Sequence, residues 1–160
     1  IELIKATVDG MAARGFGRII NITSSAVKAP IDILGLSNGA RSGLTGFVAG
    51  VARNPKLAAR GVTINNLLPG AFDTDRLRVT MANTAAKTGK AVDDIAAQRA
   101  RGIPAGRFGT AEEVAAHCLW LCAPQSSWVT GECFVVDGGG SLGKGMWLPG
   151  ERLQAGKEEA

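Results

Sequence analysis

Thr23, Ser24 and Ser25 follow a short apolar run and form the first cluster in the chain that could do chemistry. Hydroxyl groups donate and accept hydrogen bonds, so they can orient a polar ligand, but they are poor acids near neutral pH. Ser37 and Arg41 follow Ser24 by 13 and 17 residues. Arg41 stays protonated at any working pH, so it can hold a ligand but cannot relay protons. The pattern indicates a site that binds and orients a polar ligand.

These side chains must be positioned by a strand and a helix. Residues 18–23 read as a buried strand, a loop with Pro30 follows, and a helix is expected from Ser37 onward. The carboxyl end of a strand that faces a helix start is where open α/β sheets bind ligands. Ser37 has two interpretations, because serine is also a favoured helix N-cap.

Further elements of the same kind follow along the chain. An amphipathic helix is predicted to run to about Arg14, and residues 61–70 and 133–136 are predicted strands. Thr110 and Glu113 form a capping box that starts another helix. A strand, a helix and a second strand make a βαβ unit, so we predict an α/β fold.

Residues 74–103 form a polar insertion after the second predicted strand, with helical patches at 77–81 and 92–99. A long insertion at this position is usually a lid or a specificity loop. Its basic residues could attract an anionic substrate such as an acyl thioester carrier, or they could form an ordinary solvated face. These residues are Arg76, Arg78, Arg99 and Arg101.

The motifs, taken in order, resemble those of the short-chain dehydrogenase/reductase family. Asn21–Ser24 is similar to the family's Asn-Ile-Ser-Ser strand end, and Asn65–Gly70 to its Asn-x-Ile-x-Pro-Gly strand. Pro69–Thr74 fits the Pro-Gly-x-x-x-Thr turn that follows. Ile103–Ala115 and Val136–Gly139 are similar to two later segments of the family.

The resemblance implies a fold class and a domain organisation. Residues 1–140 would form the C-terminal part of a Rossmann-type doubly wound parallel α/β sheet, and residues 141–160 a Gly-rich tail. The family's N-terminal nucleotide-binding half, with its G-x-x-x-G-x-G turn, is absent from these 160 residues. The helical pattern also begins at once with Ile1, so we expect a fragment of a longer protein.

The resemblance also implies an oxidoreductase that transfers hydride between NAD or NADP and a small-molecule carbonyl or alcohol substrate, with 3-oxoacyl reductase-like activity as one option. The family uses a Tyr-x-x-x-Lys motif, in which Tyr transfers the proton and Lys holds the nicotinamide ribose. Ser37 and Arg41 occupy those positions here, and the chain contains no Tyr. The alternative is therefore a catalytically silent relative that binds a nucleotide or serves as a structural subunit.

Specific roles carry over residue by residue. The resemblance implies that Ser24 orients the substrate oxygen, with Ser37 and Arg41 as its catalytic partners. A water molecule between Ser37 and the substrate could make up for the missing aromatic ring. The implied cofactor-binding residues are Arg41, Pro69, Gly70, Phe72 and Thr74.

The composition argues against several other classes of protein. A hydrophobic content of 46% and a charged content of 20% are typical of a soluble globular protein. The net charge of +4 is spread along the chain, so no nucleic-acid partner is expected. No apolar run approaches the roughly 18 residues of a membrane span. Cys118, Cys122 and Cys133 lack zinc-type spacing, so we expect no metal and buried, reduced thiols in a cytoplasmic protein.

A stripe of glycines predicts how the protein assembles. Each glycine inside a helix costs about 1 kcal/mol relative to alanine, and close packing against another helix would offset that cost. In the family, the two matching helices pack against their copies in a second subunit, so we expect a homodimer or homotetramer. The alternative is that the glycine stripe and an apolar stripe on the first predicted helix both face the chain's own missing half. The glycines are Gly39, Gly43, Gly46 and Gly50, and the apolar stripe of the first helix is Ile1, Ile4, Val8 and Met11.

Overall fold

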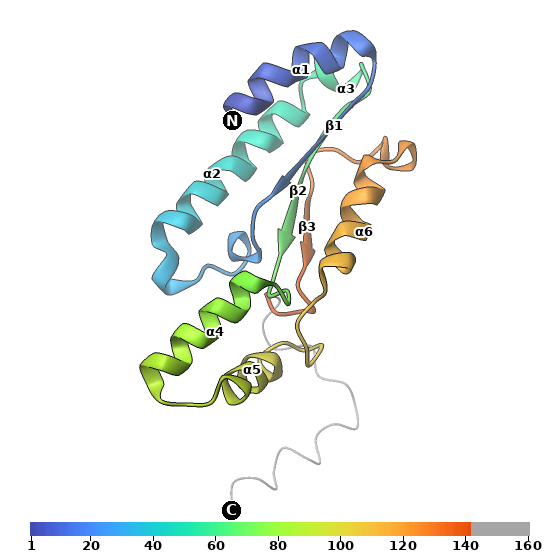
Figure 1. The fold of residues 1–160 in the computed structure, drawn as a ribbon. Helices are drawn as coiled ribbons and strands as arrows, with labels where there is room; N and C mark the ends of the chain where they lie inside the picture. Colours follow the sequence, from blue (N-terminus) through green and yellow to red (C-terminus); the bar gives the residue numbers. More distant parts are fainter. Residues whose placement is uncertain (142–160) are drawn as a thin grey trace, which may run out of the picture.

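The computed structural model describes residues 1–141 of the chain as a parallel sheet between two layers of helices (Figure 1). The strands are β1 (Gly17–Ile22), β2 (Val62–Pro69) and β3 (Cys133–Val136), in the order β1-β2-β3. Gly17 lies opposite Val62 in the first pair, and Asn66 lies opposite Cys133 in the second. Parallel pairing throughout confirms the predicted Rossmann-type α/β fold class.

Residues 1–141 contain six α-helices. Helices α1 and α2 cover one face, and α6 covers the other (Figure 1). None of the helices within residues 1–141 combines the length and the hydropathy needed to cross a lipid bilayer. The helices are α1 (Glu2–Arg14), α2 (Gly35–Ala52), α3 (Pro55–Ala58), α4 (Asp75–Thr88), α5 (Val92–Arg101) and α6 (Ala111–Cys122).

Strand β2 is the buried centre of the molecule, because strands flank it and helices cover both of its faces. Every residue from Val62 to Leu68 is buried. The buried polar side chain of Asn65 donates to the carbonyl oxygen of Val129 at 2.9 Å and accepts from the backbone N–H of Glu132 at 3.0 Å. These bonds satisfy the buried amide and fasten the segment that leads into β3.

The apolar stripe of α1 contributes to the core of this same chain. Ile4 is buried together with Val48, Ala52 and Ile64, and Val8 packs against that cluster. The expectation that this stripe packs on a second subunit is therefore wrong for Ile4, whereas Val8 is only half-buried. The glycine stripe of α2 is different, because all four of its glycines are exposed.

Two helix starts test the capping predictions. Helix α6 begins at the predicted capping box, in which Thr110 accepts from the N–H of Glu113 and the Glu113 carboxylate accepts from the N–H of Thr110. Helix α2 begins two residues before Ser37, with Leu34 at its N-cap. The interpretation of Ser37 as an N-cap is therefore wrong, and its hydroxyl lies inside the first turn of the helix.

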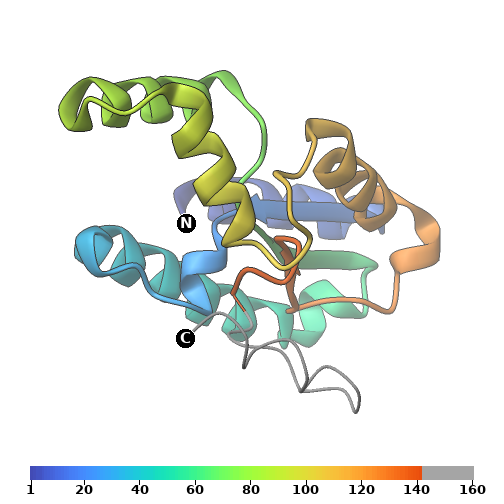
Figure 2. The same cartoon turned by 90° about the horizontal axis from the view of Figure 1, so that it is seen from below.

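The polar insertion after β2 forms a helix pair. Helices α4 and α5 replace the shorter predicted patches and pack against each other near the carboxyl ends of the strands (Figure 2). Of the predicted Gly-rich tail, only Ser141 lies within the described residues. Cys122 is exposed, so the expectation of a buried thiol is wrong at this position, while Cys118 and Cys133 are half-buried.

Candidate active site

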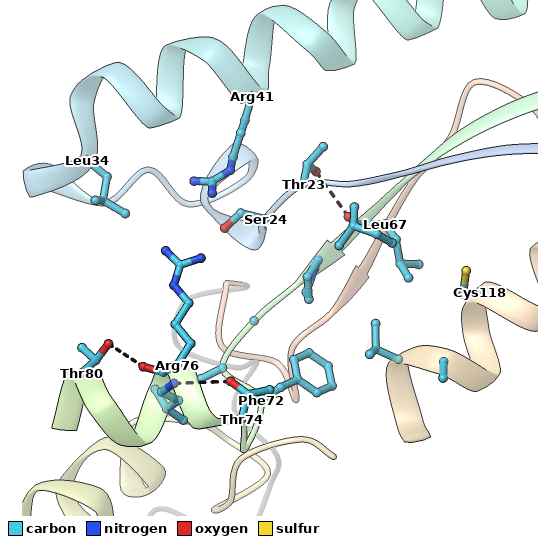
Figure 3. A pocket seen from close by; sticks show the side chains of 17 residues that line it. Thr23, Ser24, Leu34, Arg41, Leu67, Phe72, Thr74, Arg76, Thr80 and Cys118 are labelled. Atoms are coloured by element: carbon cyan, nitrogen blue, oxygen red, sulfur yellow. Dashed lines mark hydrogen bonds between the residues drawn. The ribbon is translucent and has the colours of Figure 1, made fainter. Parts of the chain in front are cut away.

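A cavity of about 580 Å³ lies at the carboxyl ends of β1 and β2 (Figure 3). Its walls come from these strand ends, from the first turns of α2 and α4, and from α6. Six of the seven predicted site residues line it, and Ser37 is the one that does not. The six are Ser24, Arg41, Pro69, Gly70, Phe72 and Thr74.

Ser24 is held at the end of β1 by its backbone. The N–H of Thr23 donates to the carbonyl oxygen of Leu67 at 2.8 Å and so continues the sheet ladder up to Ser24. The Ser24 hydroxyl oxygen accepts from the N–H of Ala26 at 3.1 Å, which caps the short 3₁₀ turn Ser25–Val27. A hydroxyl has one proton to donate, so this arrangement leaves the Ser24 proton available to an oxygen in the cavity.

Ser37 and Arg41 lie one helical turn apart on α2 and contact each other. Nη1 of Arg41 donates to the Ser37 hydroxyl oxygen. This bond turns the Ser37 hydroxyl toward the guanidinium, while the other donors of Arg41 reach the cavity (Figure 3). The structure therefore brings Arg41 and Ser24 to one cavity and leaves Ser37 beside it as a partner of Arg41.

The Pro69–Gly70 turn requires a residue without a side chain. A Cβ atom on Gly70 would lie 2.4 Å from Cβ of Asp137, far inside van der Waals contact. The N–H of Gly70 also donates to the carbonyl oxygen of Val136 at 2.9 Å. Glycine thus lets the ends of β2 and β3 approach closely and forms a smooth wall of the cavity.

Phe72 is positioned by a backbone bridge to Gly109. The N–H of Asp73 donates to the carbonyl oxygen of Gly109 at 2.8 Å, and the N–H of Gly109 donates to the carbonyl oxygen of Ala71 at 3.0 Å. A Cβ atom on Gly109 would lie 2.6 Å from the Phe72 ring. The Gly109 backbone therefore packs on the ring and sets where Phe72 meets the cavity.

Thr74 is the N-cap of α4, and its hydroxyl accepts from the N–H of Leu77 at 3.4 Å. Next to it, Asp73 and Arg78 form a two-point ion pair with N–O distances of 3.0 and 3.1 Å. The hydrogen bonds from Arg78 hold the pKa of the Asp73 carboxyl below its ordinary value. Asp73 is therefore a structural partner of α4 and has no proton to offer near neutral pH.

The most strongly shifted carboxyl near the site is Glu113, and it lies outside the cavity lining. Hydrogen bonds from Arg107, at 2.7 and 2.9 Å, and from the Thr110 backbone lower the pKa of Glu113 to about 2. This carboxylate fastens the segment that carries Gly109, and through Gly109 it supports Phe72.

Several residues that the sequence analysis did not place among the site residues also line the cavity. Arg76 had been grouped with other insertion arginines, but Arg78, Arg99 and Arg101 do not line this space. Cys118 reaches the cavity from α6, and burial raises the pKa of its thiol. The sequence could have indicated only the residues of α4, because the first turns of this helix come directly after the predicted Pro69–Thr74 turn. The additional residues include Leu34, Arg76, Leu77, Thr80, Val114 and Cys118.

The arrangement can bind and orient a polar molecule, with hydroxyl and guanidinium donors on one side and an apolar wall on the other. His117 is not part of it, because its ring packs against Trp120 and Phe134 at centroid distances of 5.8 and 5.3 Å. Among residues 1–141, no group of three His, Cys, Asp or Glu side chains could hold a metal ion.

Comparison with known proteins agrees with this geometry. The family model described as enoyl-(acyl carrier protein) reductase matches residues 1–141. The acetoacetyl-CoA reductase of Cupriavidus necator is 36% identical over 144 residues, which cover 89% of this chain and 52% of that protein. The 3-oxoacyl-(acyl-carrier-protein) reductase FabG of Vibrio harveyi is 34% identical over 140 residues, which cover 86% of this chain and 51% of that protein.

A solved structure shows the same fold. YwfH, an NADPH-dependent reductase involved in bacilysin biosynthesis, superimposes with a TM-score of 0.79 at 32% identity and covers 87% of this chain and 52% of its own. The chain thus spans about half the length of the relatives it matches. The order of the motifs, the parallel sheet and the family match over residues 1–141 together show that this chain belongs to the short-chain dehydrogenase/reductase family.

Proposed function

We propose that the protein containing this chain is an NAD(P)-dependent oxidoreductase that interconverts a small-molecule carbonyl compound and its alcohol. One observation carries the proposal: Ser24, Arg41 and the turn from Pro69 to Thr74 line a single cavity at the strand ends. The similarity to acetoacetyl-CoA reductase and to FabG supports this class of reaction.

The cavity lining fits the nicotinamide end of the cofactor. The smooth Gly70 wall and the Phe72 backbone would lie along the nicotinamide amide, and Thr74 would meet the phosphates. Arg41 would bind the ribose hydroxyls, because donors remain after its bond to Ser37. When bound, the cofactor supplies or accepts the hydride. The adenosine end lacks a glycine-rich cradle within these 160 residues, so this chain holds only part of the cofactor.

Ser24 would donate a hydrogen bond from its hydroxyl group to the substrate oxygen and so place the carbonyl carbon in the cavity. Ser37 does not line the cavity, and Arg41 keeps its charge at any working pH. Neither residue can replace a phenol as general acid at the substrate oxygen. In this proposal water therefore delivers the proton, and the chain contributes binding and orientation.

The test uses the complete protein that contains this chain. NADH and NADPH oxidation would be followed over a panel of ketones, aldehydes and 3-oxoacyl thioesters, and cofactor binding would be measured separately by titration calorimetry. We expect binding of one cofactor and turnover of at least one carbonyl compound. Bound cofactor without turnover across the panel would overturn the catalytic proposal.

The second candidate function is a catalytically silent nucleotide-binding or structural subunit. The observation that favours it is the contact between Ser37 and Arg41, which leaves the position of the family's Tyr without an acid in the cavity. The same experiment separates the two functions, since the silent protein binds cofactor but oxidises none of it.

We also propose that the protein forms a homodimer or homotetramer in the cytoplasm. The exposed glycine stripe of α2 supports assembly, because a Cβ atom built on any of its four glycines meets no atom within 4 Å in the described chain. A partner helix could therefore approach this face closely. The three thiols are unbridged, as expected in a reducing compartment.

A further inference from the structure

The cavity carries two positive charges and no negative one. Arg41 enters it from α2 and Arg76 from α4, and both guanidinium groups reach toward Ser24 (Figure 3). Within the described part of the chain, no Asp or Glu lines this cavity. Two guanidinium groups in one cavity repel each other, and an anion bound there offsets the repulsion. The cavity is therefore suited to a ligand that carries negative charge.

Arg76 differs from its neighbour Arg78 in what its side chain contacts. Arg78 binds Asp73 through two hydrogen bonds and lies 3.7 Å from the Asp75 carboxylate. The Arg76 guanidinium makes no hydrogen bond or ion pair with any residue between 1 and 141. Its donors are therefore available to a carboxylate, which a guanidinium can bind through two parallel N–H bonds.

Apolar side chains from three elements also line the cavity. Leu77 follows it on α4, Leu34 approaches from the start of α2, and Val114 lines the cavity from α6. Apolar walls suit the hydrocarbon body of a substrate. The site thus combines a hydrogen-bond donor at Ser24, a hydrocarbon-lined wall and a cation at Arg76.

We propose that Arg76 determines substrate specificity by binding the carboxylate of an oxo acid whose carbonyl oxygen accepts from Ser24. This inference rests on the proposed function, in which Arg41 holds the cofactor ribose and Arg76 remains for the substrate. A phosphate of the cofactor is the other anion that the same chemistry could bind. An experiment can separate the two anions, because the carboxylate belongs to the substrate and the phosphate to the cofactor.

The experiment compares matched acids and esters on the complete protein. The probes are acetoacetate and levulinate, each with its methyl ester, in the presence of saturating cofactor. We expect kcat/KM to favour an acid over its ester by about 10-fold or more, the scale of a hydrogen bond to a charged group. Arg76→Gln should raise the KM of the acid by about 10- to 100-fold, leave the ester unchanged and leave the cofactor KM unchanged.

Two further variants serve as controls. Arg76 and Arg101 are both exposed, but Arg101 does not line the cavity, so Arg101→Gln should leave the ratio of acid to ester unchanged. Arg76→Lys keeps the charge without the planar fork and should restore part of the preference for the acid. Equal effects of Arg76→Gln and Arg101→Gln would reduce the role of Arg76 to general surface charge and overturn the proposal.

A binding measurement separates this inference from the proposed function. Levulinate would be titrated calorimetrically into the protein saturated with oxidised cofactor. Binding that depends on Arg76, together with no oxidation of NADH or NADPH by any of the carbonyl probes, would support the inference and refute the catalytic proposal. Equal turnover of esters and acids, unaffected by Arg76→Gln, would support the catalytic proposal and refute the inference. A weaker cofactor affinity in Arg76→Gln, or acid binding that does not depend on Arg76, would overturn the inference.

Discussion

At the residue scale, the site depends on the hydrogen bonds that two serine hydroxyl groups make. Ser24 accepts a hydrogen bond from the backbone of Ala26 and keeps its proton for the cavity, whereas Ser37 accepts from Arg41 and lies outside the lining. The two serines therefore differ in their contacts, and we predict that they differ in their roles, although both stand at positions that are catalytic in the family.

Replacing each serine by alanine tests this difference in the complete protein. Ser24→Ala should lower the carbonyl-reductase rate by ~100-fold or more, the scale of a lost oxyanion donor. Ser37→Ala should leave the rate nearly unchanged, because no substrate atom is expected within its reach. Steady-state kinetics on the best substrate would decide. A large loss in Ser37→Ala with little change in Ser24→Ala would reverse the two assignments.

The Glu113–Arg107 pair makes a prediction about pH. The pKa of Glu113 is about 2 in the folded protein and 4.5 as its ordinary value, so its stabilising contribution is complete above pH 4.5. It declines as the pH falls from 4.5 toward 2, because the unfolded chain then binds more protons than the folded one. Glu113→Gln keeps a capping-box residue but removes the ion pair.

We expect Glu113→Gln to lower the melting temperature at pH 7 and the difference from the native protein to shrink below pH 4.5. Thermal melts between pH 7 and pH 2.5 would measure it. Arg107→Gln should produce the same pH dependence, because it removes the other partner of the pair. A difference that stays constant down to pH 2.5 would show that the pair is not responsible.

At the element scale, the backbone bridge between the segment after β2 and the segment before α6 sets the position of Phe72. Gly109→Ala should push the Phe72 ring aside, because the new Cβ would lie 2.6 Å from it. We expect a cofactor dissociation constant up to about 10-fold higher, the scale of one lost hydrogen bond. Gly10→Ala, in α1 and away from the cavity, is the control. Unchanged cofactor binding in Gly109→Ala would contradict this positioning role.

Substitutions at Gly43 test whether the glycine stripe of α2 faces solvent or an interface, because the change in stability has opposite signs in the two cases. In solvent, Gly43→Ala should stabilise the protein by about 0.5–1 kcal/mol through helix propensity, because nothing in the described chain opposes the new methyl group. At a tight interface, Gly43→Leu should instead cost several kcal/mol and dissociate the oligomer. We expect dissociation, measured by light scattering. An unchanged mass and melting temperature in Gly43→Leu would exclude this stripe as the interface.

At the scale of the whole molecule, this chain would supply one end of the proposed cofactor site. Within residues 1–141, β1 pairs only with β2, and Ile22 at its end is 59% exposed. We expect residues 1–160 alone to bind NAD(P) weakly or not at all, because no glycine-rich phosphate turn lies in them. Titration calorimetry would measure it, with circular dichroism to verify folding. Micromolar affinity of this chain alone would contradict the expectation.

The sequence by itself determined the class of fold and most of the cavity. Apolar strands that end in hydroxyls, a Pro-Gly turn and a capping box act through local backbone preferences, so they can be recognised without coordinates. This explains why β3 and the start of α6 lie where they were predicted. It also explains why six predicted site residues share one cavity, since parallel strands end at the same edge.

Only the tertiary structure decided which of several equivalent residues does what. Four arginines of the insertion look alike in sequence, but only Arg76 lines the cavity, while Arg78 is bound to Asp73. Ser37 matches a catalytic position by spacing, yet its hydroxyl lies against Arg41. Such choices depend on which side chains reach one another through space, and the order of residues along the chain does not contain that information.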